Sequence, residues 1–382
     1  MALPTVNRSV AGGSDRRDAS APLRHVDPVL LIATLLVAGL GTLMVFSATK
    51  GSDAEADTYF LRRQGTFMAI GCALMVVAAA VDYQRIRDFA VFIYAGVCFL
   101  LFLVVSPLGS SSKGAQAWFA IGTFQLQPSE FAKIGLIIGL GALLATWRGD
   151  IDLRRLGIAL LAAGLPMGLI MLQPDLGTAL VFIAIVMAMF LVAGVKARHL
   201  VLLSIVGVVG IVGVLHSNVL KDYQKSRLTT FLDPAQDKSG TAYNLNQSII
   251  TISRGRLTGD GLFEGKQTQL RYVPEQQTDF IFTVVGEELG FVGAASFLVL
   301  MGVIIWRIWR TAALARDQFG QLVCVGVLAM FVFQVFESVG MTMGIMPVTG
   351  IPLPFMSYGG STTLACFVGV GLVQNIHMRR FR

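Results

Sequence analysis

One carboxylate, Asp279, stands where the sequence passes from polar to apolar residues. It lies in the stretch VPEQQTDFIFTVVGEELG (residues 273–290), which ends a polar segment and begins a long apolar run. An ionisable side chain at the boundary between water and membrane is costly, so proteins rarely carry one there without a use for it. A carboxylate in such a place could act as a general base or bind a divalent cation. Asp279 is therefore the first candidate for a catalytic residue.

Three further segments share this pattern, because each begins an apolar run with proline and polar residues. They are QPSE (127–130), QPDLG (173–177) and PFMSYGGS (354–361), beside PEQQTD (274–279). Proline is favoured in the first turn of a helix, and Ser129, Asp175 and Thr278 or Asp279 could simply be caps or first-turn acids of the helices that follow. The other interpretation is that four helix N-termini, each with free N–H groups and a partial positive charge, gather around a phosphate or diphosphate.

Several polar side chains near these segments could line the same cavity. Glu130 and Lys133 are three residues apart and would pair on one helix face, either as a structural ion pair or as part of a site. The remaining candidates are Asp175, Ser357, Ser361 and, from the long polar segment, Arg271, whose guanidinium could meet an anionic head group.

The composition indicates what kind of protein must hold these residues in place. Of 382 residues, 54% are hydrophobic and 14% are charged, with a mean hydropathy of +0.69, whereas about a quarter of the residues are charged in soluble proteins. Apolar runs near the spanning length of about twenty residues fall at 28–47, 64–82, 89–106, 130–147, 156–173, 175–194, 199–216, 279–305, 320–342 and 356–377. The sequence therefore predicts an all-α polytopic membrane protein with about ten transmembrane helices.

The placement of arginine and lysine sets the orientation of these spans. With the N-terminus inside, the inner segments carry 17 of the 30 basic residues, and most of the others lie in the loop at 217–278, where the rule has little force. We therefore expect both termini in the cytoplasm, a disordered cytoplasmic tail at 1–27, a transmembrane domain at 28–378 and an extracytoplasmic loop at 217–278. Glu287 and Glu288 would then lie near the inner half of a span, with a role in helix packing or at the cytoplasmic edge rather than in catalysis. The net charge of +7 reflects this asymmetry and anionic lipid, not nucleic acid.

The long loop carries two patterns of its own. Residues 243–253 have apolar side chains at 245, 249, 250 and 252, which favours a short amphipathic helix on the membrane surface. The stretch RGRLTGDGLFEG (254–265) is rich in glycine, but its spacing fits neither a dinucleotide-binding motif nor a P-loop, so we expect turns.

Four motifs in order give the chain a resemblance to a known family. They are GAQAW (114–118) with QPSE (127–130), QPDLGT (173–178), the stretch 274–290, and MPVTGIPLPFMSYGGS (346–361). With ten spans and a long outer loop, the chain resembles the SEDS family (shape, elongation, division and sporulation) over about residues 28–380. The segment PVTGIPLP is more similar to the matching segment of the elongation-type members than to that of the division-type members. Gln277 and Gln116 depart from the family pattern, in which histidine and arginine are frequent at these places.

The resemblance implies a peptidoglycan glycosyltransferase of the bacterial plasma membrane, with an outward-facing active site. Such an enzyme polymerises lipid II into glycan strands for cell-wall elongation and cell shape, and it releases undecaprenyl diphosphate. Asp279 matches the family's essential aspartate, with a divalent cation, Mg²⁺ or Mn²⁺, as the implied cofactor. Glu130, Lys133 and Asp175 match cavity residues of the family. The implied partner is a class B penicillin-binding protein, which is a transpeptidase.

Two other classes of protein share some of these features. A flippase for lipid-linked precursors would also have helix ends and charges inside the membrane, and a scaffold for a transpeptidase would need only spans that a partner can contact. The polar residues crowd the outer half of the predicted spans, whereas a transporter needs them through the full depth of the membrane. A scaffold gives no reason for Asp279. The sequence therefore favours the enzyme.

Overall fold

The computed structural model describes residues 25–50, 54–112, 115–122, 124–147, 151–216 and 240–380. Each of the ten predicted spans corresponds to a helix within these ranges, which confirms the prediction of an all-α polytopic membrane protein. Most of the tail predicted at 1–27, and the first part of the loop predicted at 217–278, lie outside the described residues.

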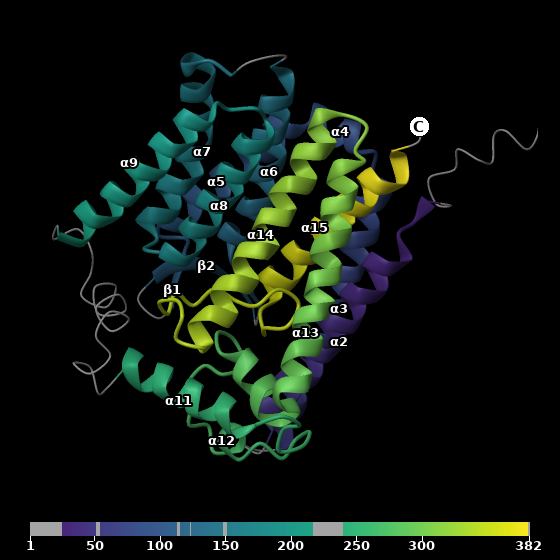
Figure 1. The fold of residues 1–382 in the computed structure, drawn as a ribbon, viewed down its shortest axis with the longest axis vertical. Helices are drawn as coiled ribbons and strands as arrows, with labels where there is room; N and C mark the ends of the chain where they lie inside the picture. The colour runs from purple at the N-terminus through teal and green to yellow at the C-terminus, as the bar shows by residue number, and fades with distance from the viewer. Residues whose placement is uncertain are drawn as a thin grey trace, which may run out of the picture.

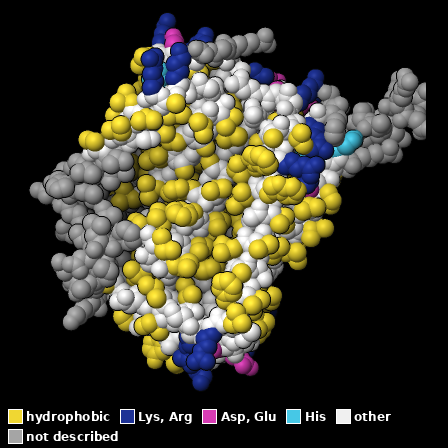
Figure 2. Space-filling model, in the orientation of Figure 1, with side chains coloured by type: hydrophobic (Ala, Val, Ile, Leu, Met, Phe, Trp, Pro, Cys, Tyr) yellow, Lys and Arg dark blue, Asp and Glu magenta, His cyan; other side chains and the backbone are white. Residues whose placement is uncertain are grey.

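The helices that correspond to the predicted spans form one bundle (Figure 1). They are α2 (Pro28–Thr49), α3 (Ala54–Ala80), α5 (Ala90–Val105), α6 (Pro128–Thr146), α7 (Leu153–Leu172), α8 (Leu176–Val192), α9 (Ala197–His216), α13 (Ile281–Ala313), α14 (Gln318–Thr342) and α15 (Gly360–Arg379). Of these, α2, α3, α6, α7, α13 and α14 are each long and apolar enough to cross a membrane. Hydrophobic side chains cover the middle of the face in Figure 2, and Lys and Arg gather towards its two ends, as expected of a membrane protein.

Shorter elements lie at the two ends of this bundle. At one end lies α4 (Tyr83–Asp88), and at the other lie α11 (Thr241–Arg254) and α12 (Lys266–Gln269), so we call these the α4 end and the α11 end (Figure 1). Between α5 and α6 the chain forms a small antiparallel sheet in the order β1 (Ser110–Ser112), β2 (Ala115–Ile121) and β3 (Phe124–Leu126), which the sequence did not predict.

The predicted amphipathic helix is present as α11. One face of this helix packs against α13 and α14, where the Ser248 hydroxyl donates to the carbonyl of Thr342 at 2.6 Å. Ile249 and Ile250 are exposed on another face. The helix is therefore held mainly by the protein, with part of its apolar surface left uncovered.

The helix α15 packs against α3, α6, α13 and α14. It is almost wholly buried, although it carries polar side chains such as Gln374 and Asn375. Glycine allows a close approach here, because a Cβ atom on Gly371 would lie 2.5 Å from the carbonyl oxygen of Met75 on α3. A helix surrounded by other helices needs no lipid-facing apolar side, which explains why α15 is more polar than α2 or α14.

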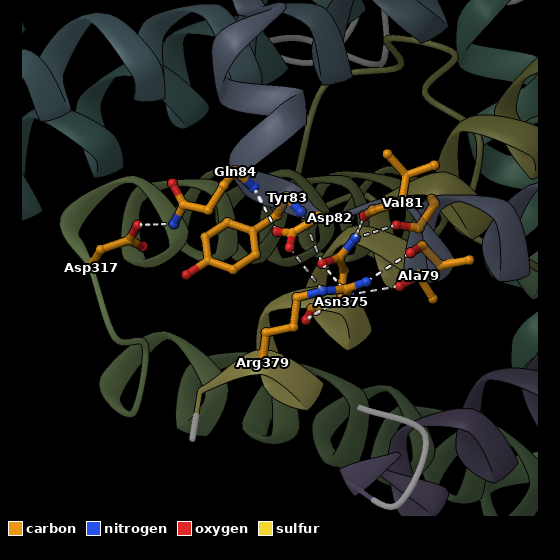
Figure 3. A network of polar contacts seen from close by, with 10 residues as sticks. Ala79, Val81, Asp82, Tyr83, Gln84, Asp317, Asn375 and Arg379 are labelled. Atoms are coloured by element: carbon orange, nitrogen blue, oxygen red, sulfur yellow. Dashed lines mark hydrogen bonds and ion pairs between the residues drawn. The ribbon is translucent and has the colours of Figure 1, made fainter. Parts of the chain in front are cut away.

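The last turns of α15 cap the end of α3 (Figure 3). An α-helix leaves its last carbonyl groups without partners inside the helix. The Asn375 amide donates to the carbonyls of Ala78 and Val81, and the Arg379 guanidinium donates to the two carbonyls between them at 2.9 and 2.7 Å. Two helices that are far apart in the sequence are thereby joined at the α4 end.

Replacing Asn375 by leucine should lower the thermal stability of the protein. The change would leave the carbonyls of Ala78 and Val81 without these partners, and an unpaired buried polar group costs about 1–3 kcal/mol. Gln374→Leu is the matched control, because the Gln374 amide is buried without a hydrogen-bond partner among the described residues. Thermal unfolding of the purified variants should give the lower midpoint for Asn375→Leu, and equal midpoints would contradict the capping role.

The helix α13 is longer than the hydrocarbon core of a membrane is thick. Its 33 residues would extend for about 50 Å at 1.5 Å per residue, against a core of about 30 Å. The helical geometry is interrupted at Gly290, where φ is 63° and ψ is −162°. The part before Gly290 therefore has no need to lie inside the membrane.

The glycine-rich stretch 254–265 forms mostly turns, as predicted, and it packs on this first part of α13. A Cβ atom added to Gly255 would lie 1.8 Å from the carbonyl oxygen of Gly286, and one added to Gly259 would lie 2.1 Å from that of Glu288. Only glycine lets two backbones approach so closely. The glycines of this stretch thus serve packing between the loop and α13.

The predicted position of Glu287 and Glu288 is wrong. Both residues lie in the first part of α13, at the α11 end and beside the end of α2, instead of near the inner half of a span. The Glu288 carboxylate accepts hydrogen bonds from the Ser47 hydroxyl of α2 and from the N–H of Phe263, the latter at 3.2 Å. The apolar run of α13 exceeds the length that a span needs, so its first turns belong with the loop.

Candidate functional site

Gln127 joins the first turns of three helices. It is the N-cap residue of α6 and is followed by proline. Its backbone N–H donates to Ser361 Oγ at 2.9 Å, at the start of α15, and its side-chain amide donates to Asp175 Oδ2 at 3.4 Å, at the start of α8. Three of the four proline-containing segments that the sequence singled out are therefore in direct contact.

Asp175 and Ser357, two of the predicted site residues at these starts, each have partners in the fold. Asp175 is the N-cap of α8 and accepts hydrogen bonds from the N–H and the hydroxyl of Thr178 at 3.0 and 2.7 Å. Ser357 Oγ accepts from the N–H of Leu353 at 2.9 Å and so holds the turn before α15. Capping is thus one role of Asp175, and its place in a binding site stays a prediction.

Glu130 and Lys133 form a buried ion pair on α6. Lys133 Nζ lies 2.7 Å from Glu130 Oε1, and the two side chains are 2% and 3% exposed. The second carboxylate oxygen of Glu130 and the hydroxyl of Ser129 are also buried, without a hydrogen-bond partner in the described part of the chain. Buried polar atoms are normally hydrogen-bonded. These two atoms therefore indicate that water or a polar ligand completes this group, which lies within electrostatic reach of Asp175.

Asp279 lies in a turn just before α13. The helix begins at Ile281 with Phe280 as its N-cap residue. The N–H of Asp279 donates to the carbonyl of Glu275 at 3.1 Å, and the residue is half-buried. Asp279 thus lies at the start of α13, as the sequence indicated, and its role as a base or a metal ligand stays a prediction.

The segment that precedes α15 connects Asp279 with the three helix starts. The N–H of Tyr358 donates to the carbonyl of Gln277 at 2.9 Å, two residues before Asp279. Three residues after Tyr358, Ser361 contacts Gln127 as described above. The structure therefore links all four predicted segments through this one connection.

An arginine and an aromatic cluster that the sequence did not single out lie beside Tyr358. Phe60 and Phe67 of α3 pack against the Tyr358 ring with centroid distances of 5.1 and 6.3 Å, and the Arg63 guanidinium lies 5.7 Å from the centroid of the Phe67 ring. Burial raises the pKa of the Tyr358 hydroxyl, and the charge of Arg63 partly opposes this shift. The hydroxyl stays protonated at neutral pH and can donate a hydrogen bond. The signal that could have found Arg63 is its placement on the predicted outer side, against the charge rule.

Arg271 has a structural contact at the end of α2. Its Nη2 group donates to the carbonyl of Thr49 at 3.2 Å, which caps that helix. The residue is otherwise exposed. Its contact with an anionic head group therefore stays a prediction.

A divalent cation at this site would need ligands beyond this chain. In the ranges that the structure covers, no group of three or more His, Cys, Asp or Glu side chains could hold a metal ion. Mg²⁺ commonly binds through one or two carboxylates together with substrate phosphates, and Asp279 and Glu275 belong to the same turn. The donor set fits a cation that is shared with a diphosphate, and it does not fit a cage made by the protein.

Known proteins resemble the chain over nearly its whole length. The model of the FtsW/RodA/SpoVE family, described as cell cycle proteins, matches residues 28–381. The chain is 38% identical over 357 residues to Stage V sporulation protein E of Bacillus subtilis, covering 92% of this chain and 96% of that protein. It is 35% identical over 356 residues to the peptidoglycan glycosyltransferase MrdB of Escherichia coli K12, covering 93% and 94%.

Solved structures resemble the fold as well. A chain from a study of polymerization and crosslinking by a peptidoglycan synthase complex has a TM-score of 0.79 and 32% identity, covering 94% of this chain and 99% of that one. The crystal structure of the rod shape determining protein RodA of Thermus thermophilus has a TM-score of 0.71 and 29% identity, covering 94% and 98%. The residues matched by the family model include every candidate site residue.

Proposed function

Because the chain belongs to the FtsW/RodA/SpoVE family of cell cycle proteins and is a peptidoglycan glycosyltransferase that spans the membrane, we propose that Asp279 and the helix starts joined by Gln127 form its active site. The observation that carries this proposal is the connection of all four segments through Tyr358. The proposed substrate is lipid II, both as donor and as acceptor, and the proposed leaving group is undecaprenyl diphosphate.

The proposed reaction needs a base for the acceptor hydroxyl and positive charge for the leaving diphosphate. As the acceptor hydroxyl oxygen bonds to the donor sugar carbon, its proton passes to the Asp279 carboxylate, and the bond from that carbon to the diphosphate breaks. The departing diphosphate gains negative charge, which Lys133, Arg63 and the N-termini of α6, α8 and α15 can stabilise. The cavity that binds the diphosphate is proposed to be lined also by Ser357, Ser361 and Arg271.

The divalent cation is proposed to be held by Asp279 and Glu275 together with the diphosphate. When bound, Mg²⁺ or Mn²⁺ would neutralise charge on the leaving group. Asp279 then has two possible roles, as the base or as a carboxylate ligand, and both require its negative charge.

Incubation of the purified protein with labelled lipid II tests the function directly. Glycan chains should form, and their yield should fall when divalent cations are removed with a chelator. Transport of lipid II across a vesicle membrane without any glycan product would instead support the flippase.

A class B penicillin-binding protein is the proposed partner, and cell-wall elongation is the proposed role. The similarity to a chain of a peptidoglycan synthase complex supports the partner, and the PVTGIPLP segment supports the role in elongation. Co-purification of such a transpeptidase with this chain in mild detergent should raise the glycan yield in the same assay. The absence of both effects would count against the partner.

Both termini are proposed to lie in the bacterial cytoplasm, with the α11 end facing outward. The start of α2 lies beside the end of α13, because Asp27 forms an ion pair of 2.6 Å with Arg307, and the charge of Asp27 also reaches His377 in the last turn of α15. Asp27 precedes the first span and His377 ends the last, so their proximity at one end of the bundle supports the proposal that both termini lie on the same side of the membrane.

Cysteine labelling should confirm this orientation. Leu262 at the α11 end and Leu314 at the end of α13 are 41% and 48% exposed, so they form a matched pair. A membrane-impermeant thiol reagent added to intact spheroplasts should label Leu262→Cys and spare Leu314→Cys. Labelling of only the second position would overturn the orientation and the outward-facing site with it.

A further inference from the structure

A carboxylate with no part in the proposed chemistry, Glu287, is fully buried in the first part of α13. Both of its oxygens accept hydrogen bonds from the start of α12. Oε1 accepts from the N–H of Gln267 at 2.7 Å, and Oε2 accepts from the N–H and the hydroxyl of Thr268 at 2.9 and 2.7 Å. Both oxygens of this buried carboxylate therefore act as acceptors, for three donors in all.

The Thr268 hydroxyl connects Glu287 with Gln276. Because its proton points to Glu287, its oxygen is left to accept, and Gln276 Nε2 donates to it at 3.0 Å. The same Nε2 donates at 3.0 Å to the hydroxyl oxygen of Thr283, whose own proton points to the carbonyl of Phe280 at 2.7 Å. Each hydrogen bond of this network therefore has one defined direction. Gln276, Thr268 and Thr283 are all buried.

This buried hydrogen-bond network holds residues on both sides of Asp279. Gln276 lies three residues before Asp279 and Phe280 one residue after it, and both are held by the network. The turn itself is closed by the N–H of Asp279, which donates to the carbonyl of Glu275 at 3.1 Å. With both flanks held, the backbone of Asp279 has little freedom to move.

We propose that Glu287 is a positioning residue that holds the Asp279 turn in its working geometry through Thr268 and Gln276. The proposal rests on the catalytic role of Asp279 proposed above. Glu287 itself does not touch the reacting atoms, so its effect must reach the reaction through the position of Asp279.

Thr268→Val breaks the connection with the smallest change of shape. The variant removes the hydroxyl that both donates to Glu287 and accepts from Gln276, whereas the two backbone N–H groups on Glu287 remain. A shift of about 1 Å in a catalytic group can cost about 10²-fold in rate. The turnover number should therefore fall by about this factor, with the KM for lipid II unchanged.

Three further variants separate positioning from folding. Thr268→Ser retains the hydroxyl and should restore activity. Thr251→Val is the matched control, because the Thr251 hydroxyl is equally buried but donates only to the carbonyl of Gln247 within α11, at 2.7 Å. Gln276→Met removes the two donated hydrogen bonds and leaves the contact of Thr268 with Glu287, so it should lower the turnover number as Thr268→Val does.

The experiment measures glycan formation from labelled lipid II by the full-length protein, with thermal unfolding of each variant alongside. Wild-type turnover in both Thr268→Val and Gln276→Met would overturn the proposal, as would equal losses in Thr268→Val and Thr251→Val. Full activity of Asp279→Asn would instead overturn the proposed active site. The two failures are therefore distinguishable, and Gln276→Met decides the outcome if Thr268→Val does not fold.

Discussion

Asp279→Asn should fold, insert in the membrane and bind lipid II, yet form almost no glycan. Asparagine preserves the size of the side chain and loses its charge and basicity, and the removal of a general base typically lowers the rate by about 10²–10⁴-fold. A purely structural role would have a different result, since the loss of a helix cap costs only about 1 kcal/mol of stability.

The matched control for this variant is Asp260→Asn. Asp260 lies in the same loop, is partly exposed and forms an ion pair of 3.1 Å with Arg254, so its replacement removes a carboxylate away from the Asp279 turn. Glycan formation from labelled lipid II should be near the wild-type rate in Asp260→Asn. Near wild-type polymerisation by a well-folded Asp279→Asn protein would contradict the catalytic role of Asp279 and would favour a function as a flippase or a scaffold.

Lys133→Met should have the largest effect on stability. The change leaves the Glu130 carboxylate buried without its partner at 2.7 Å, and breaking a buried ion pair from one side costs about 3–5 kcal/mol. Thermal unfolding should show a large drop in the midpoint, and polymerisation should be lost as well. Glu130→Gln leaves the Lys133 charge buried without its carboxylate and should also lower the midpoint. Its loss of activity should be smaller, because the lysine can still meet a diphosphate.

The double variant Glu130→Gln, Lys133→Met separates the two roles of the pair. It removes both charges at once, so no unpaired buried charge remains, and a buried ion pair can often be replaced by neutral groups at little cost. We expect its unfolding midpoint to recover towards the wild-type value and its activity to stay low. Wild-type polymerisation by the double variant would show that the pair serves packing alone.

The hydrophobic spans and the site carboxylate could be predicted because their signals are local. A run of apolar residues near the spanning length indicates a membrane helix wherever it stands, and all ten such runs are helices. Asp279 could be found in the same way, because an ionisable residue at the edge of an apolar run is unusual by itself. The glycine-rich turns of 254–265 and the amphipathic helix of the long loop follow from equally short patterns.

Helix length alone misplaced Glu287 and Glu288. The apolar run that contains them continues for 33 helical residues, and nothing in its composition marks the interruption at Gly290 as the point where the helix meets the loop. Their true partners, on α2 and at the start of α12, are brought close only when the loop folds back. The wrong prediction thus arose from treating a long helix as though all of it were membrane.

The class of protein, the set of helices and the candidate residues can be predicted from the order of the amino acids, since each depends on neighbours within a few turns. Which of those residues meet depends on the folded bundle. Gln127 and Ser361 are separated by 234 positions along the chain, Asn375 and Ala78 by 297, and Arg63 reaches Tyr358 only because α3 packs against α15. Such contacts depend on how whole helices pack against one another, and the packing is set by side chains from every part of the bundle, so no local pattern records it.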